Sequence, residues 1–205
     1  MAPIEAIIFD IGRVIIDFDH LRAAQQLGAI SGLSAPHIWD IFYKSGIATR
    51  YERGLLSTEQ MMSYLHKEAV RQNFTREEFI YAAGDIFKPK VDTINLIYEL
   101  KDAGYPLYLL SNTCEAHWQV FSQRYPVFQE CFQGHTLSFE VKAMKPEARI
   151  FDAAITKAAK LPGACFYTDD VRDFVTAART QGMHAVLFKG AAQLRQQLLS
   201  AGVSL

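Results

Sequence analysis

From residue 89 to the end of the chain, short apolar segments alternate with amphipathic helical patterns, and this alternation most constrains the fold. Four segments have the composition of strands, and a helical pattern follows each of them: residues 106–110, 132–137, 165–168 and 185–188. Strands that alternate with helices are typical of parallel sheets, because parallel neighbours need a crossover connection. The sequence therefore predicts an α/β domain built on a parallel sheet.

One further strand opens the chain. Ile4–Phe9 is an apolar run that ends in Asp10, and Gly12 begins a tight turn two residues later. Residues 17–88 look helical throughout and contain no convincing strand. We therefore predict a helical insertion, residues 17–88, placed after the first strand of a sheet domain that comprises residues 1–16 and 89–205.

The insertion carries its own helix signals. A short first helix is predicted at Leu21–Leu27. Ser57 with Gln60, and Thr75 with Glu78, have the spacing of capping boxes and precede apolar residues at helical intervals. Tyr51–Gly54 is predicted to be the loop between the second and third helices.

Polar side chains stand at three predicted strand ends and before one predicted helix. They are Asp10, Ser111 with Asn112, Lys145, and Asp169 with Asp170. The carboxyl ends of parallel strands share one edge of the sheet, so these groups can converge. Three carboxylates suit Mg²⁺, a lysine suits an anionic substrate, and together they are typical of phosphoryl transfer.

Each of these groups also has a structural explanation when it is taken alone. Aspartate, serine and asparagine favour turns. Lys145-Pro146 has the form of a helix start, and Asp169-Asp170 suits a helix N-terminus. The joint occurrence of all four groups on successive elements favours a site.

Composition excludes several other classes of function. The net charge is −1 without a basic stripe, which argues against a nucleic-acid partner. Apolar runs of membrane-spanning length and a secretory leader are not found, so no membrane partner is expected. The three cysteines lack metal-ligand spacing and cannot all pair, which suits a cytoplasmic location. The sequence assigns no oligomeric state.

In this order, the polar groups resemble the four motifs of the haloacid dehalogenase superfamily over essentially the whole chain. Asp10–Val14 corresponds to the first motif, Asp-x-Asp-x-Thr/Val, and Ser111, Lys145 and Asp169-Asp170 correspond to the other three. The resemblance implies a Rossmann-like parallel sheet with helices on both faces and a mobile helical cap, as in the first subclass of the family. The Asp-x-Gly and Ser-Asn-Thr motifs resemble the α-D-glucose-1-phosphate phosphatase type.

The resemblance also implies roles at the metal. Asp10 would be the nucleophile and a Mg²⁺ ligand, and Gly12 would give its backbone carbonyl to the metal. Asp170 would be a further ligand, and Asp169 would bind directly or through water. Asp173 would orient this loop.

A second set of roles concerns the substrate. Ser111 and the backbone near Asn112 would bind the transferring phosphoryl group. Lys145 would stabilise the charge on the nucleophile and the phosphate. Arg13 follows the nucleophile closely and is expected to contact the substrate.

The chain departs from the family at Gly12, where the family usually has an aspartate that is a general acid and base. General acid–base catalysis typically raises the reaction rate by about 10²–10⁴-fold. Three interpretations stay open. A cap residue, water or the substrate supplies the proton; the enzyme is slow; or the protein binds phosphorylated ligands without turning them over. Glu52 is one candidate acid, and a solvated loop charge is the alternative interpretation of that residue.

The expected function is Mg²⁺-dependent hydrolysis of a small phosphorylated metabolite, for example a sugar phosphate, through an aspartyl-phosphate. One alternative is a 2-haloacid dehalogenase, which would use the same aspartate to attack carbon. Dehalogenases of the family carry Ser-x-Asn at the fourth motif, which Asp169-Asp170 does not match. The other alternative is a catalytically weak protein that binds phosphorylated ligands.

Overall fold

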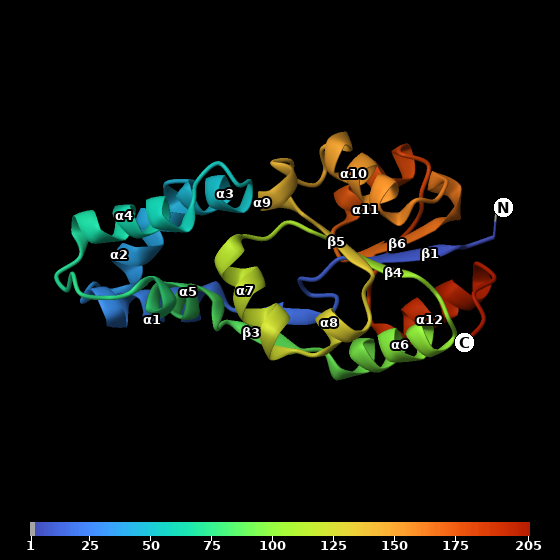
Figure 1. The fold of residues 1–205 in the computed structure, drawn as a ribbon, viewed down its shortest axis with the longest axis horizontal. Helices are drawn as coiled ribbons and strands as arrows, with labels where there is room; N and C mark the ends of the chain where they lie inside the picture. The colour runs from blue at the N-terminus through green and yellow to red at the C-terminus, as the bar shows by residue number, and fades with distance from the viewer. Residues whose placement is uncertain (1–2) are drawn as a thin grey trace.

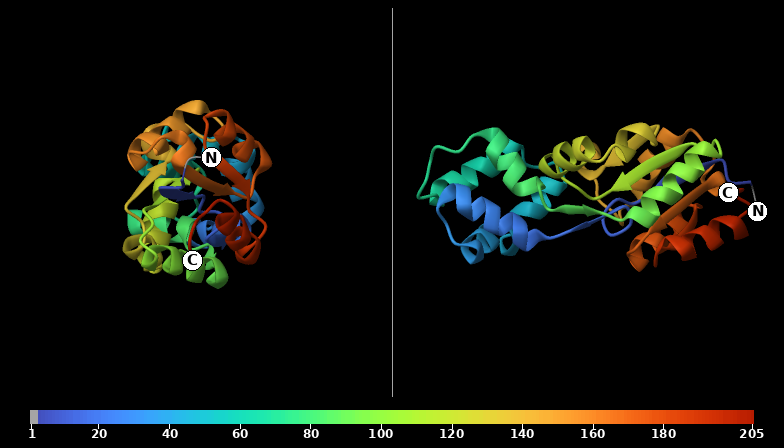
Figure 2. Two further views of the ribbon diagram at one scale, coloured as in Figure 1. Left: turned by 90° about the vertical axis from the view of Figure 1, so that its right-hand side faces the viewer. Right: turned by 90° about the horizontal axis from the view of Figure 1, so that it is seen from below.

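The computed structural model describes residues 3–205, which form a sheet domain and a group of helices at one end of it (Figures 1 and 2). The five strands of the main sheet are β1 (Ala6–Phe9), β4 (Leu107–Ser111), β5 (Gly134–Leu137), β6 (Cys165–Asp169) and β7 (His184–Leu187). Their order is β5-β4-β1-β6-β7, and every neighbouring pair is parallel. The predicted α/β class is confirmed.

Helices cover both faces of this sheet, because its strands are apolar on both sides. In β1, Ile7 and Phe9 pack into one layer, while Ala6 and Ile8 pack into the other. The first layer contains α6 (Val91–Asp102) and α12 (Ala191–Ser200), and the second contains α10 (Ala148–Ala158) and α11 (Arg172–Thr180). The remaining helices of the sheet domain are α7 (Glu115–Arg124), α8 (Val127–Glu130), α9 (Ser138–Val141) and a 3₁₀ turn at Pro162–Ala164.

The other group consists of five α-helices and a π-helix, which we call the cap helices. They are α1 (His20–Ser31), α2 (Ala35–Trp39), the π-helix Asp40–Lys44, α3 (Ile47–Glu52), α4 (Thr58–Glu68) and α5 (Arg76–Gly84). Both expected capping boxes are present, at Ser57 with Gln60 and at Thr75 with Glu78. The apolar core of the cap helices extends onto Cys114 and Ala116, so these helices pack against α7.

The prediction that residues 17–88 are helical throughout is wrong at both ends of that range. Strand β2 (Ile16–Phe18) pairs antiparallel with β3 (Phe87–Pro89), and this two-stranded ribbon connects the cap helices to the sheet. Three-residue strands are too short to show a period of two in sequence.

Some predicted element ends also move. The first cap helix runs to Ser31, where Gly32 ends it in the left-handed conformation. Tyr51 and Glu52, predicted to lie in a loop, form the last turn of α3. Lys145-Pro146 lies in the turn before α10, which begins only at Ala148. No helix within residues 3–205 is long and apolar enough to cross a membrane.

Candidate active site

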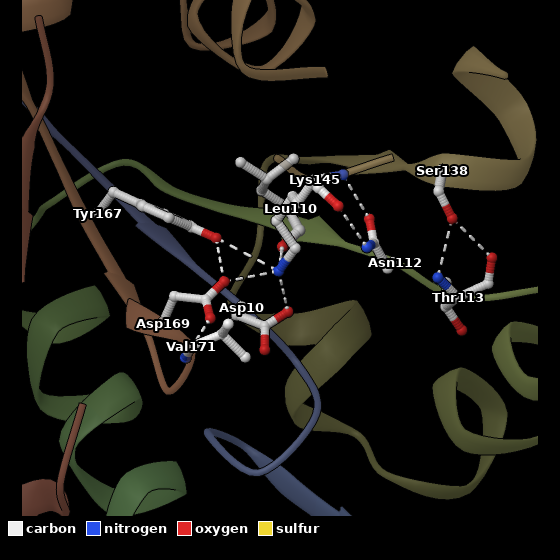
Figure 3. A network of polar contacts seen from close by, with 9 residues as sticks. All are labelled: Asp10, Leu110, Asn112, Thr113, Ser138, Lys145, Tyr167, Asp169 and Val171. Carbon is white, nitrogen blue, oxygen red and sulfur yellow. Dashed lines mark hydrogen bonds and ion pairs between the residues drawn. The ribbon is translucent and has the colours of Figure 1, made fainter. Parts of the chain in front are cut away.

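A buried lysine joins the carboxyl ends of three strands. Lys145 Nζ lies 2.7 Å from Asp10 Oδ1 and 2.7 Å from Asp169 Oδ2, and it lies 3.3 Å from both Leu110 O and Tyr167 OH (Figure 3). A charged group is stable in a protein interior only when it is paired and hydrogen-bonded. The lysine therefore has a full set of acceptors, and it fixes two aspartates at one edge of the sheet.

Strand order explains why these groups meet. Strand β1 lies between β4 and β6. After β1 the chain adds β4 and β5 on one side of it and then β6 and β7 on the other, so the strand order reverses at β1. The backbone N–H of Asp10 donates to Thr168 O at 3.0 Å, which extends the β1–β6 pairing to Asp10. Such switch points are where open α/β sheets bind ligands.

The electrostatics of the three groups are coupled. Burial raises the pKa of the Asp10 carboxyl, the Lys145 ammonium partly offsets this, and the Asp169 carboxylate adds to it. Burial would lower the pKa of Lys145, but the carboxylates of Asp10 and Asp169 outweigh it and raise that pKa. Lys145 therefore stays charged at neutral pH, and its single positive charge faces the carboxylates of both Asp10 and Asp169.

Asp10, Asp169 and Asp170 each offer a carboxylate oxygen, and these oxygens lie within 4.8 Å of one another. The oxygens of Asp169 are already engaged by Lys145, by Tyr167 OH and by the backbone N–H of Val171 at 2.8 Å. Asp170 is half-buried and forms no ion pair within residues 3–205. Burial, followed by the Asp169 charge, raises the pKa of Asp170.

This donor set fits a small divalent cation. Asp170 and Asp10 Oδ2 have no basic partner in the described chain, and the Gly12 carbonyl accepts no hydrogen bond there. Mg²⁺ binds oxygen ligands and keeps several waters, so two carboxylates and a carbonyl suffice. The excess negative charge around Lys145 gives a cation an electrostatic reason to bind.

The other side of the site comes from the end of β4. Ser111 is buried, and its hydroxyl forms no hydrogen bond within residues 3–205. The Asn112 side chain pairs with the backbone of Lys145, its Oδ1 accepting from Lys145 N at 2.8 Å and its Nδ2 donating to Lys145 O at 3.1 Å (Figure 3). The Asn112 amide therefore positions the lysine turn, and the side chain leaves the expected role of the Asn112 backbone unchanged.

Phe18 occupies the space beside Gly12. A Cβ at Gly12 would lie 3.0 Å from Phe18 Cε1, so the ring stands where the side chain of the family's usual aspartate would begin. Arg13 is exposed, has a φ of 58°, and its guanidinium carbon lies 5.2 Å from the centroid of the Phe18 ring. The structure thus stacks Arg13 on Phe18.

Glu52 is not a solvated loop residue. It ends α3, where its main-chain oxygen accepts a hydrogen bond from Ser138 Oγ at 2.6 Å, and Ser138 Oγ in turn accepts one from Thr113 N at 2.9 Å. Its side chain lines a cavity between the cap helices and α7. Burial raises the pKa of Glu52 to about 7.

Two contributors to the site were missed from sequence. Tyr167 precedes Asp169 by two residues on β6, so both side chains point to the same face, and this spacing could have identified it. Ser138 has no local signal, because its partners are 25 and 86 residues away. Asp173, in contrast, is exposed in the first turn of α11, outside the acidic group.

Comparison with known proteins agrees with this geometry. A family model of haloacid dehalogenase-like hydrolases matches residues 4–182. D-ribitol-5-phosphate phosphatase from Bacteroides thetaiotaomicron is 28% identical over 204 residues, which cover 95% of this chain and 97% of that protein.

Solved structures give the same picture. The HAD family enzyme BT-2542 from Bacteroides thetaiotaomicron, in complex with magnesium and inorganic phosphate, is 25% identical with a TM-score of 0.77, over 91% of this chain and 95% of that one. L-2-haloacid dehalogenase from Xanthobacter autotrophicus is 15% identical with a TM-score of 0.62, over 98% and 85% of the two chains, so that likeness is one of fold.

Proposed function

Because the chain belongs to the haloacid dehalogenase-like hydrolase family, we propose that it is a magnesium-dependent phosphatase of a small phosphorylated metabolite. The observation that carries this proposal is the position of Lys145 between Asp10 and Asp169, with Asp170 beside them. The relative that hydrolyses D-ribitol 5-phosphate supports a sugar or polyol phosphate as the substrate class.

The residues proposed to hold Mg²⁺ are Asp10, the Gly12 carbonyl and Asp170, with Asp169 behind them. When bound, the ion supplies positive charge to the phosphate oxygens and to the nucleophile. Asp169 is already held by Lys145 and Tyr167, so it binds the ion through water or positions the lysine.

Hydrolysis then has two steps. Asp10 attacks phosphorus, which forms an aspartyl-phosphate and releases the alcohol; water then attacks this phosphorus and frees Asp10. Lys145 keeps its position and its charge throughout, because it is paired on two sides. Ser111 and the main chain at Asn112 donate hydrogen bonds to the phosphoryl oxygens.

Residues 17–88 are proposed to act as a cap domain over a core of residues 1–16 and 89–205. Several contacts hold the cap helices against the sheet domain. The Tyr51 hydroxyl accepts a hydrogen bond from Ala116 N at 3.0 Å, and Arg53 forms a 2.6 Å ion pair with Glu147. In this closed arrangement the cap helices exclude bulk water from the reacting phosphate.

The acidic pair favours a phosphatase over a 2-haloacid dehalogenase, although both would use Asp10. Attack on carbon with halide departure needs no metal, whereas Asp170 adds a carboxylate beside Asp10 and Asp169 that forms no ion pair with Lys145, and a metal cation would offset its charge.

Phosphate release from a panel of esters, with Mg²⁺ and with EDTA, tests the proposal. The panel comprises D-ribitol 5-phosphate, hexose 1-phosphates, hexose 6-phosphates and 4-nitrophenyl phosphate. We expect release that requires Mg²⁺, and the best ester identifies the substrate class. No release from any ester would contradict the proposal.

Asp10→Asn tests the nucleophile. We expect this variant to lose Mg²⁺-dependent turnover while circular dichroism shows the wild-type fold. Asp152→Asn is the matched control, because Asp152 is an exposed aspartate on α10. Wild-type turnover in Asp10→Asn would rule out the aspartyl-phosphate.

A further inference from the structure

A cavity of about 40 Å³ lies where the cap helices meet α7, large enough for a water molecule. Its titratable lining consists of Tyr43, Tyr51 and Glu52 from the cap helices, with Cys114 and His117 from the start of α7. The other lining residues are mostly apolar.

One row of contacts connects this cavity to the nucleophile. Tyr43 OH lies 3.4 Å from His20 Nδ1, and the centroid of the His20 ring lies 4.9 Å from that of Phe18. Phe18 covers Gly12, the residue two positions after Asp10. His20 and Phe18 therefore lie between Tyr43 of the cavity lining and Gly12, the position where the family's usual aspartate is absent.

A second row of contacts fixes Glu52 to the phosphate side of the site. Ser138 bridges the Glu52 main chain and Thr113, two residues after Ser111 (Figure 3 shows the Ser138–Thr113 part). The Glu52 carboxyl forms no ion pair and no hydrogen bond with any residue of the described chain, 3–205. Its backbone is fixed and its carboxyl is available to a ligand.

The other titratable groups of the cavity cannot exchange protons near neutral pH. Burial lowers the pKa of His117 to about 3. Burial raises the pKa values of Cys114 and Tyr43 far above neutrality. Burial raises the pKa of Glu52 to about 7, which is the range in which a general acid and base is most effective.

We propose that Glu52 is the general acid and base of the reaction, in place of the aspartate that Gly12 lacks. This inference rests on the proposed phosphatase function. It assigns a catalytic role to the cap helices beyond the exclusion of water, and it makes the docking of α3 on Ser138 part of the active site.

The proton balance of both steps follows. In the first, Asp10 forms a bond to phosphorus, the ester P–O bond breaks, and protonated Glu52 gives its proton to the leaving oxygen. In the second, the Glu52 carboxylate takes a proton from the attacking water. The bond between phosphorus and Asp10 breaks, and phosphate leaves with Glu52 protonated again.

Glu52→Gln removes the acidic proton and keeps the docking of α3, because Ser138 Oγ donates its hydrogen bond to the main-chain oxygen of residue 52. For an alkyl ester such as D-ribitol 5-phosphate, we expect kcat to fall by about 10²–10⁴-fold. With 4-nitrophenyl phosphate the leaving group needs no proton, so the first turnover should keep its wild-type rate. A burst of nitrophenolate followed by slow turnover is expected, with phosphorylated Asp10 trapped by acid quench.

Asp40→Asn is the control within the cap helices, since it removes an exposed ion pair with Lys44 that does not join the cap helices to the sheet domain. It should leave kcat within about twofold of wild type. If Glu52→Gln slows the first turnover of both esters equally, or of neither, Glu52 is not the general acid. Such a result with an active wild-type enzyme leaves the phosphatase function intact, whereas an inactive wild type contradicts that function itself.

Discussion

Gly54 lies so close to the main chain of Phe139 that a Cβ at position 54 would overlap the Phe139 carbonyl oxygen. Gly54 also has a φ of +69°, in the region that side chains disfavour. Phe139 follows Ser138, the residue that holds Glu52. The contact therefore determines how closely α3 approaches the proposed site.

Gly54→Ala should push α3 away from α9 and lower kcat/KM for alkyl esters. Gly46→Ala is the matched control, because Gly46 has a φ of +77° and a Cβ added there would have no atom within 4 Å. Both variants should lose about 1–2 kcal/mol of stability from backbone strain, and Gly54→Ala should lose more because its Cβ also overlaps the Phe139 main chain. Urea unfolding and steady-state kinetics check this, and equal kcat/KM values for the two variants would contradict it.

Mg²⁺ should raise the thermal unfolding temperature of the protein, and Asp170→Asn should abolish that rise. Saturation at 100 times Kd adds about 2.7 kcal/mol. Without the metal, Asp170→Asn should be no less stable than wild type, because burial and the Asp169 charge disfavour the ionised side chain. Differential scanning calorimetry with Mg²⁺ and with EDTA measures both effects. If Mg²⁺ raises the unfolding temperature of Asp170→Asn as much as that of wild type, Asp170 does not bind the metal.

Asp85 should make stability depend on acid pH, because it connects the cap helices to α7. Its buried carboxylate forms ion pairs with Arg22 of α1, at 2.7 Å, and with Arg124 of α7. Burial would raise the pKa of Asp85, but the two arginines outweigh it and lower that pKa from 3.8. As the pH falls from 3.8 towards the lower pKa of the folded protein, the unfolded chain binds a proton at Asp85 before the folded protein does. The stabilisation from these ion pairs is therefore lost.

Asp85→Asn should therefore cost about 1–3 kcal/mol near pH 7, and the difference from wild type should shrink as the pH falls below 3.8. Urea unfolding at a series of pH values measures it. Asp40→Asn, which removes an exposed pair with Lys44, should show little change at any pH. A pH-independent cost for Asp85→Asn would contradict the ion-pair explanation.

Glu52 should have the opposite pH dependence. Its pKa rises from 4.5 to about 7 on folding, so between these values the folded protein holds a proton that the unfolded chain has lost. Wild-type stability from this group therefore falls as the pH rises from 4.5 to about 7. His117 has the opposite effect in part of this window, because its pKa falls from 6.5 to about 3 on folding, but this effect is the same in wild type and in a variant of Glu52.

The variant Glu52→Gln should thus gain stability relative to wild type above pH 7 and lose that advantage below pH 4.5. Denaturant unfolding at the two ends of the window tests this without any substrate or metal. Parallel stability curves for the two proteins would show that the carboxyl titrates normally.

Local patterns predicted most of the sheet. The strands β1 and β4 are short apolar runs, β6 begins as one, and Asp10, Ser111 and Asp169 mark the ends of these three strands, which meet. Because the carboxyl ends of parallel strands share an edge, the sequence order of these residues was enough to predict that they converge.

Long-range contacts could not be predicted in this way. The bridge from Ser138 to Glu52 spans 86 residues, and nothing in either neighbourhood indicates it. The sequence also gives no indication that the Asn112 side chain pairs with the backbone of Lys145, 33 residues away. Such pairings depend on how the turns face one another, which local patterns do not encode.

The two strands of the β2–β3 ribbon leave and re-enter the sheet domain at one point, where Lys90 N donates to Ile15 O at 2.9 Å. The cap helices are therefore a single insert whose length and sequence can vary without changing the connections of the five strands. Changes in this insert can therefore alter what surrounds Lys145 and its aspartates while these residues keep their positions. If Glu52 supplies the proton, an exchange of this insert between relatives exchanges the acid together with the specificity.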